Sequence, residues 1–282
     1  MSDRVSTSEL RETWESAAPG WAKWETEFAK NLVGPTEKLL DLAGVASGMR
    51  VLDLACGAGS QTLKAAARVG EGGQIVACDI ASEMLVHLGR NAERAGLDNI
   101  ETLCSAAEDL ADAVPPVDAA ISRLGLMLFA SPKDALAAVQ SVLKPGARFA
   151  ALVFTTPDNN PYQSKPMAIL RRHAAAPPPA PQAPGLFALG APGVLEGLLR
   201  DSGFADIEMV TLRAPVRLAS ADDALAFLRE AAGAYRAVVA HLSDEAQAAA
   251  WAEVRDCVGQ FETETGFETA YELIIGSGAK PR

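Results

Sequence analysis

The alternation of short apolar runs with longer amphipathic stretches between residues 49 and 155 is the feature that most limits the folds open to this chain. The apolar runs have the length of buried strands, and the stretches between them have helical spacing. Apolar strands separated by helices are typical of a parallel sheet that is covered on both faces. The predicted strands are 51–54, 74–78, 100–104, 117–122 and 148–155, and the predicted helices are 60–69, 82–95 and 132–143.

The segments on either side of this pattern predict additions to a single α/β domain. Two further strands are expected at 207–218 and 270–275, with an alanine-rich helical block at 221–260 between them, and a helix is expected at 193–201. The expected division is an N-terminal helical segment at 1–44, a core at 45–156, a proline-rich loop and helix at 157–204, and the last strands with their helical insertion at 205–282.

Large apolar side chains form a helical stripe near the N-terminus, at successive spacings that suit one helical face. The stripe consists of Trp14, Trp21, Trp24, Phe28 and Leu32. Pro19 and Gly20 interrupt it, so we expect two short helices before residue 33. Pro35 suits the first turn of a further helix, which Gly44 ends.

Proline dominates the segment 157–185, which includes Pro177, Pro178, Pro179, Pro181 and Pro184. Proline removes a backbone N–H and clashes with the preceding helical turn. We therefore expect a stiff crossing loop or a lid there, rather than one helix.

Composition and charge exclude several classes of protein. Apolar residues make up 49% of the chain, which is enough for a sizeable core, and the net charge is −11. A protein that binds nucleic acid or anionic membrane needs a basic face, so neither partner is expected. The four cysteines are scattered, and no run has the length of a signal-peptide core or a membrane span. These features predict a cytoplasmic protein.

The run from Val51 to Ser60 carries the strongest chemical signal. Gly57 and Gly59 allow a sharp turn from strand to helix and a close approach of a ligand to the backbone. Asp53 lies inside the strand before that turn, where a carboxylate would repel a diphosphate. A ligand with an ammonium group and a sulfonium would be attracted instead, and S-adenosylmethionine (SAM) has both.

Asp79 stands at the end of the second predicted strand. At this position of a doubly wound sheet, a carboxylate can accept hydrogen bonds from both hydroxyls of a ribose. An aspartate after a strand is more often a turn residue, but the ordered series Asp53, Gly57, Gly59 and Asp79 favours ligand binding.

The runs DLACGAGSQTL, ACDIASEML, CSAAEDL and VDAAISRLGLMLF, in this order and spacing, resemble class I SAM-dependent methyltransferases. The resemblance is to the ubiquinone/menaquinone-biosynthesis branch and its small-molecule relatives. It implies a Rossmann-like, doubly wound, seven-stranded sheet with an antiparallel last strand, an N-terminal helical lid and a helical insertion before the last strand. It also implies transfer of a methyl group to O, N or C of a small molecule, with S-adenosylhomocysteine (SAH) as the other product. The segments 1–33, 157–185 and 221–260 carry many aromatic side chains and few clustered charges, which predicts an apolar or aromatic acceptor.

The resemblance also implies which residues hold SAM. Ala106 stands where the family often has an aspartate that bonds the adenine amine, so the backbone of Ala107 is expected to serve there. The other implied contacts are Asp53 and the backbone of Ala55, Gly57 and Gly59 for the methionine part, Asp79 for the ribose, Ile80 and Met84 for the adenine, and Ser122 and Arg123 beside the methionine end.

Two other functions remain open at this point. A nicotinamide-dependent oxidoreductase would share the glycines and Asp79, but its fingerprint needs a third small residue where Thr62 stands. A SAM-binding scaffold without catalytic activity would have the same binding residues. His173 and Tyr162 are the only candidates for a catalytic group, and no metal site is expected because no two histidines have ligand spacing. The oligomeric state is not predicted.

Overall fold

The computed structural model describes residues 6–111, 113–177, 180 and 183–282. One mixed sheet forms its centre, with the order β3-β2-β1-β4-β5-β8-β6. The strands are β1 (Arg50–Leu54), β2 (Gln74–Asp79), β3 (Ile100–Cys104), β4 (Val117–Arg123), β5 (Leu143–Phe154), β6 (Ala205–Leu218), the short β7 (Glu262–Thr263) and β8 (Gly266–Ala279).

The sheet confirms the predicted doubly wound topology. Strands β1 to β5 are parallel to one another, and β8 runs antiparallel between β5 and β6. Seven strands were expected; the described residues contain an eighth, β7, which pairs only with β8 at its outer end. The first five strands are apolar because both faces of the sheet are covered.

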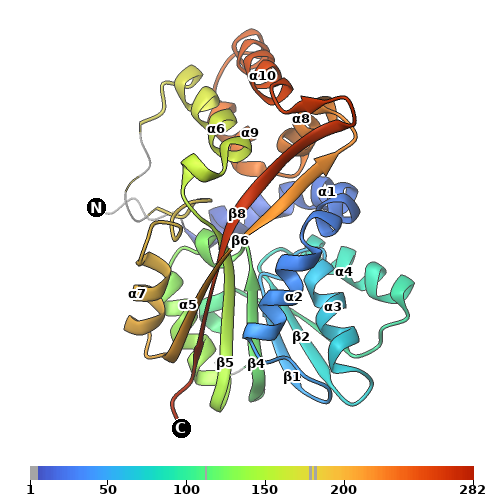
Figure 1. Ribbon diagram of the computed structural model, residues 1–282, viewed down its shortest axis with the longest axis vertical. Helices are drawn as coiled ribbons and strands as arrows, with labels where there is room; N and C mark the ends of the chain where they lie inside the picture. Colours follow the sequence, from blue (N-terminus) through green and yellow to red (C-terminus); the bar gives the residue numbers. More distant parts are fainter. Residues whose placement is uncertain (1–5, 112, 178–179, 181–182) are drawn as a thin grey trace.

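Helices cover the two faces of the sheet in the order that right-handed crossovers require. Helices α3 (Ser60–Val69) and α4 (Ser82–Ala95) connect β1, β2 and β3 and lie on one face, where α2 (Val33–Leu42) contacts α3. Helices α5 (Pro132–Val142) and α7 (Val194–Asp201) connect strands on the other side of β1 and therefore lie on the opposite face (Figure 1).

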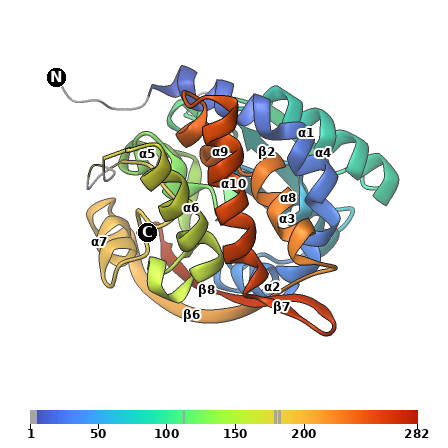
Figure 2. The ribbon, with the colours of Figure 1, turned by 90° about the horizontal axis from the view of Figure 1, so that it is seen from above.

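A second group of helices stands beyond the carboxyl ends of the parallel strands (Figures 1 and 2). We call this group the cover. It comprises α1 (Thr7–Asn31), α6 (Pro161–His173), α8 (Ala221–Glu230), α9 (Gly233–Val239) and α10 (Asp244–Gly259). Helix α10 packs on α6 and α8, and α1 packs on α8 and α9. The outer halves of β6 and β8 extend into the cover, so the sheet and the cover share these two strands.

The expectation of two short N-terminal helices was wrong. Helix α1 continues for 25 residues with Pro19 inside it. Its first turn is fixed by a capping box in which Glu9 N–H donates to Ser6 Oγ and Ser6 N–H donates to the Glu9 carboxylate. A proline inside a helix costs about 3 kcal/mol. The buried packing around Ala17 and Ala18, which are fully buried, offsets that cost.

The expectation that 157–185 is a loop was wrong for its first half. Helix α6 begins at Pro161. A proline is tolerated in the first turn of a helix because the N–H groups there have no partner within the helix. Pro166 lies inside the helix and is buried, as are Tyr162 and Leu170. The segment also contains the short 3₁₀ helix Pro157–Asn159. Pro178, Pro179 and Pro181 lie outside the described residues.

None of the helices in the described ranges has both the length and the apolar character that a membrane span requires. The apolar core instead gathers between the sheet and its helices and continues into the cover.

Candidate cofactor and substrate site

The loop between β1 and α3 has backbone angles that few residues adopt. Gly57 and Gly59 have φ values of 56° and 99°, and Ala55 has φ of 56°. A Cβ atom added to Gly59 would lie 2.7 Å from Leu88 Cγ, so glycine lets α4 approach the loop closely. The loop therefore exposes backbone N–H groups at the start of α3, which suits a ligand.

Asp53 lies behind this loop and supports it. Its carboxylate accepts a hydrogen bond of 2.6 Å from Thr62 Oγ1 and one of 3.3 Å from Gln61 Nε2. Gln61 Nε2 also donates to the Cys56 carbonyl at 3.0 Å, which ties α3 to the loop. Asp53 is fully buried and is not part of the cavity wall. The structure thus places it beneath the expected methionine site rather than in contact with it.

Asp79 lies on the cavity wall at the carboxyl end of β2, as its sequence position predicted. Its two oxygens accept hydrogen bonds from Gly57 N–H at 2.8 Å and Ala81 N–H at 3.0 Å. Burial raises the pKa of this carboxyl group, and these two N–H donors oppose the rise. Each carboxylate oxygen has a second lone pair, so the group can still accept from a diol.

One cavity of about 830 Å³ extends from this loop to the underside of the cover. Its first end is formed by the loop 55–58 together with Asp79, Ala107 and Glu108, which places backbone polar groups and two carboxylates on the wall. Its second end is mainly apolar, and its wall there comes from α1, α6, α8 and α9, the segment 183–188 and the segments at the ends of β4 and β5. The large side chains at that end are Trp21, Phe28, Met127, Phe129, Phe154, Met167, Leu186, Phe187, Phe227 and Val238.

Comparison with known proteins assigns the core to a family. Residues 35–170 match the model of the ubiE/COQ5 methyltransferase family. A ubiquinone/menaquinone biosynthesis C-methyltransferase of Teredinibacter turnerae is 37% identical over 123 residues, which are 43% of this chain and 49% of that protein. The region 35–170, slightly less than half of the chain, is therefore similar to the ubiE/COQ5 methyltransferases. It spans about half the length of the curated relatives it matches.

Solved structures show the same fold at low sequence identity. A protein of Bacillus halodurans C-125 described as a methyltransferase is 16% identical, with a TM-score of 0.59, over 88% of this chain and 100% of its own. A phosphoethanolamine N-methyltransferase 2 of Haemonchus contortus, in complex with phosphomonomethylethanolamine and SAH, is 17% identical, with a TM-score of 0.58, over 99% of this chain and 61% of its own.

The structure brings most of the residues expected to hold SAM to this one cavity. Those that form its wall are Ala55, Gly57, Asp79, Ile80, Met84, Ala107 and Arg123. The others stand behind the wall, and these are Asp53, Gly59, Ala106 and Ser122. Gly59 shapes the loop through its backbone, and Ala106 is buried directly before the 3₁₀ helix that presents Ala107.

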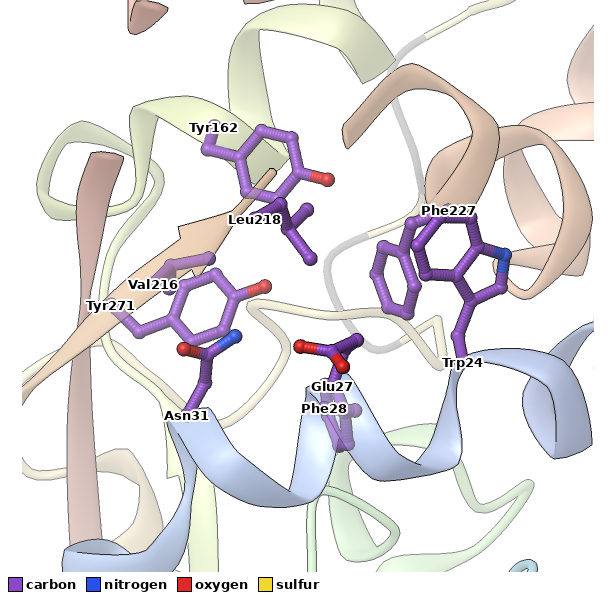
Figure 3. Close-up of a pocket in the computed structure, with 9 residues that line it drawn as sticks. All are labelled: Trp24, Glu27, Phe28, Asn31, Tyr162, Val216, Leu218, Phe227 and Tyr271. Atoms are coloured by element: carbon purple, nitrogen blue, oxygen red, sulfur yellow. The ribbon is translucent and has the colours of Figure 1, made fainter. Parts of the chain in front are cut away.

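The two residues considered as catalytic groups do not line the large cavity. Tyr162 lines a separate cleft of about 10 Å³ between α1 and the strands of the cover, together with Tyr271 (Figure 3). Its hydroxyl donates to the Ala224 carbonyl at 2.8 Å, and burial raises its pKa well above the ordinary value. His173 Nε2 lies 2.8 Å from a carboxylate oxygen of Glu253 on α10.

Helix α1 closes the cavity from above and is held along its length. The Glu15 carboxylate accepts hydrogen bonds from the backbone N–H groups of Ser82 and Glu83, at the start of α4. Further along, Glu230 of α8 accepts from Trp24 Nε1 at 2.7 Å and forms an ion pair with Lys23. The aromatic stripe therefore forms both part of the core and the roof of the cavity.

The polar residues on the cavity wall that sequence reasoning did not identify include Gln61 and Glu25. Gln61 lies in the first turn of α3, just after the glycine loop. Its position in the sequence did not indicate that its side-chain amide would donate a hydrogen bond back to that loop. Glu25 interrupts the aromatic stripe of α1 on the face that carries Trp21 and Phe28. A single carboxylate within an apolar helical face was the available signal.

The buried carboxyl group of Asp53 should make stability depend on pH. Burial raises its pKa from 3.8 to about 6, against the hydrogen bonds from Thr62 and Gln61. The folded protein therefore holds this proton more tightly than the unfolded chain, so the free energy of unfolding falls as pH rises from about 4 to about 6. Because one pKa unit corresponds to about 1.4 kcal/mol, the full effect approaches 3 kcal/mol.

Denaturant unfolding of the wild type and of Asp53→Asn between pH 4.5 and pH 7 measures this effect. Asparagine cannot ionise, so the variant should gain stability relative to the wild type as pH rises, on top of a constant cost for its altered hydrogen bonds. A stability difference that does not change with pH would show that Asp53 does not titrate in this range.

Proposed function

We propose that this protein transfers a methyl group from SAM to a small, apolar or aromatic acceptor molecule. The observation that carries the proposal is the single cavity that joins the glycine loop and Asp79 to an apolar chamber under the cover. Pockets for small ligands have volumes of about 300–1,000 Å³. The volume of about 830 Å³ suits a cofactor and an acceptor side by side.

The residues on the wall fit SAM in kind and in order. Because β3, β2, β1 and β4 are neighbours, their carboxyl ends form one row along the cavity. Ala107 follows β3, Asp79 ends β2, the glycine loop follows β1 and Arg123 ends β4. Along the row from β3 to β4, the wall therefore offers an apolar pocket, a carboxylate that can accept hydrogen bonds from a diol, backbone N–H donors and a cation. These groups, in this order, suit a nucleoside that carries a charged tail.

The protein's part in the reaction is to align two molecules and exclude water. When bound, SAM supplies a methyl group on a sulfonium, which is already activated for transfer. The aromatic roof of α1 and the apolar side chains of α6 and α8 hold the acceptor and keep water out of the chamber. A general base is required only where the acceptor is a weak acid such as a hydroxyl.

Binding and turnover experiments test this proposal against its two alternatives. Calorimetry with SAH and, separately, NADH distinguishes a methyltransferase from a nicotinamide-dependent enzyme, and tight NADH binding without SAH binding would refute the proposal. Mass spectrometry of small molecules that copurify with the protein identifies candidate acceptors. Transfer of a labelled methyl group to such a molecule separates an enzyme from a scaffold, which would bind SAM without turnover.

We also propose that the acceptor is a free small molecule and not a nucleic acid. The net charge of −11 opposes phosphate binding. The second end of the cavity is lined mainly by aromatic and aliphatic side chains, with Arg171 as its one basic residue among those described. The cytoplasmic location stays a prediction.

Turnover should not require an added metal ion. The described residues contain no group of three or more His, Cys, Asp or Glu side chains arranged to hold one. With an acceptor in hand, methyl transfer should proceed at the same rate after dialysis against EDTA as before. A loss of activity that magnesium restores would show that the reaction uses a metal.

A further inference from the structure

Two charged side chains on the cavity wall have a polar atom without a hydrogen-bond partner among the described residues. These atoms are Nε of Arg123, at the end of β4, and Oε1 of Glu25, on α1. Buried polar atoms in folded proteins almost always have a partner. Their presence in a wall that is otherwise largely apolar points to a ligand that supplies the missing contacts.

The surroundings of Arg123 hold both of its terminal nitrogens and leave the Nε side of its guanidinium without a partner among the described residues. Nη1 donates to Thr36 Oγ1 at 2.9 Å, and Nη2 donates to Ser60 Oγ at the start of α3. The Phe28 ring lies 5.7 Å from the guanidinium carbon. Arg123 is only 8% exposed, so its Nε–H, which has no partner among the described residues, is fixed in place and faces no bulk water.

Glu25 acts on the charge of Arg123 but, within the described residues, does not pair with it directly. The Glu25 carboxylate favours the charged form of Arg123, against the effect of burial. No ion pair between them exists in the described part of the chain. A cation and an anion that face one cavity without touching suit a ligand that carries both charges.

The direction of α1 places this pair at one end of the cofactor row. Glu15, early in α1, binds the start of α4 just beyond Asp79 and the end of β2. Phe28, near the other end of α1, lies over Arg123 and the end of β4. Glu25 is therefore on the β4 side of the loop, and Asp79 is on the β2 side. A ligand with its diol at Asp79 would extend its other end toward Glu25 and Arg123.

We propose that Glu25 and Arg123 together bind the α-amino acid end of SAM, which rests on the function proposed above. Glu25 Oε1 accepts from the α-ammonium group, and Arg123 Nε donates to the α-carboxylate. The helical roof would then contribute directly to cofactor binding, so that the cofactor and α1 stabilise each other in the closed arrangement.

Calorimetry with three ligands tests this assignment. SAH carries both charged groups, decarboxylated SAH keeps only the ammonium, and 5′-methylthioadenosine has neither. Glu25→Gln should weaken the binding of SAH and of decarboxylated SAH roughly 10- to 100-fold, the range for a lost hydrogen bond to a charged group. It should leave the binding of methylthioadenosine unchanged. Glu12→Gln, at an exposed position of the same helix, is the matched control.

Arg123→Lys tests the other half of the pair. Lysine keeps the positive charge but has no Nε donor at that position, so SAH affinity should fall while the affinity for decarboxylated SAH stays closer to that of the wild type. Thermal unfolding without ligand checks that each variant is folded. Among the described residues Glu25 Oε1 has no hydrogen-bond partner, so Glu25→Gln loses only the charge that favours ionised Arg123 and should unfold close to the wild-type temperature.

The outcomes separate this proposal from the proposed function. If the wild type binds SAH but Glu25→Gln binds it equally well, the SAM site stands and the role of Glu25 is overturned. Equal losses for SAH and methylthioadenosine would also overturn it, because the effect would not depend on the amino acid group. If the wild type binds none of the three ligands, the proposed function fails as well.

Discussion

Replacing Asp79 by alanine should weaken SAH binding by about 1–3 kcal/mol, which is roughly a 5- to 150-fold loss of affinity. The carboxylate is the one acidic group at the end of β2 on the cavity wall, and it faces the place where the resemblance puts a ribose. Its loss also frees the N–H groups of Gly57 and Ala81, so the glycine loop loses part of its support. The effect should therefore lie toward the upper end of that range.

Calorimetry on matched variants separates the two causes. Asp79→Asn keeps one acceptor oxygen and should lose less affinity than the alanine variant. Asp98→Ala removes an exposed carboxylate beyond the end of α4 and should bind SAH as the wild type does. If Asp79→Ala binds SAH with unchanged affinity, the ribose assignment is wrong.

Gly20→Ala should disrupt the roof of the cavity while leaving the sheet intact. A Cβ atom on Gly20 would lie 2.1 Å from the Glu230 carbonyl oxygen, at the end of α8. Neither backbone can yield without moving a helix, so α1 and α8 must separate. Overpacking of this kind costs about 1–3 kcal/mol or more. We expect a lower unfolding temperature and, because water enters the chamber, a loss of turnover of at least about tenfold.

Gly34→Ala provides a control for this substitution. Gly34 lies in α2, and a Cβ atom there would meet nothing within 4 Å. Alanine favours the helix by up to about 1 kcal/mol over glycine, so this variant should be as stable as the wild type or slightly more stable. If Gly20→Ala behaves like Gly34→Ala in both unfolding and turnover, α1 does not pack against α8 as described.

The core of the fold was predictable because it follows local rules. Each parallel strand is a short apolar run, and the crossover rule leaves few ways to connect such strands through helices. The loop at Gly57 and Gly59 and the position of Asp79 follow from the same rules, since a strand end and a glycine turn fix both. These elements agree with the prediction to within a few residues, apart from β5 and β8, which are longer.

What could not be predicted depends on contacts between distant segments. Pro19 and Gly20 suggested a helix break, but the glycine is needed for the close approach of α8, and the packing of α1 outweighs the proline. Asp53 was expected to meet the ligand, but its side chain turns toward Thr62 inside α3. Nothing in the local sequence shows that Glu25 shares a cavity with Arg123, almost a hundred positions later.

The outer end of the β6–β8 pair has a consequence for how such a protein can diversify. The chain leaves the sheet after Leu218 and returns through β7, and both Leu218 and Glu262 pair with Phe267. The ends of the whole α8–α10 segment are therefore neighbours, and its length can change at little cost in loop-closure entropy. Recombination or insertion at this junction can remodel the apolar end of the cavity while the loop 55–58 and Asp79 remain untouched, which would separate changes in the proposed acceptor specificity from changes in the proposed cofactor site.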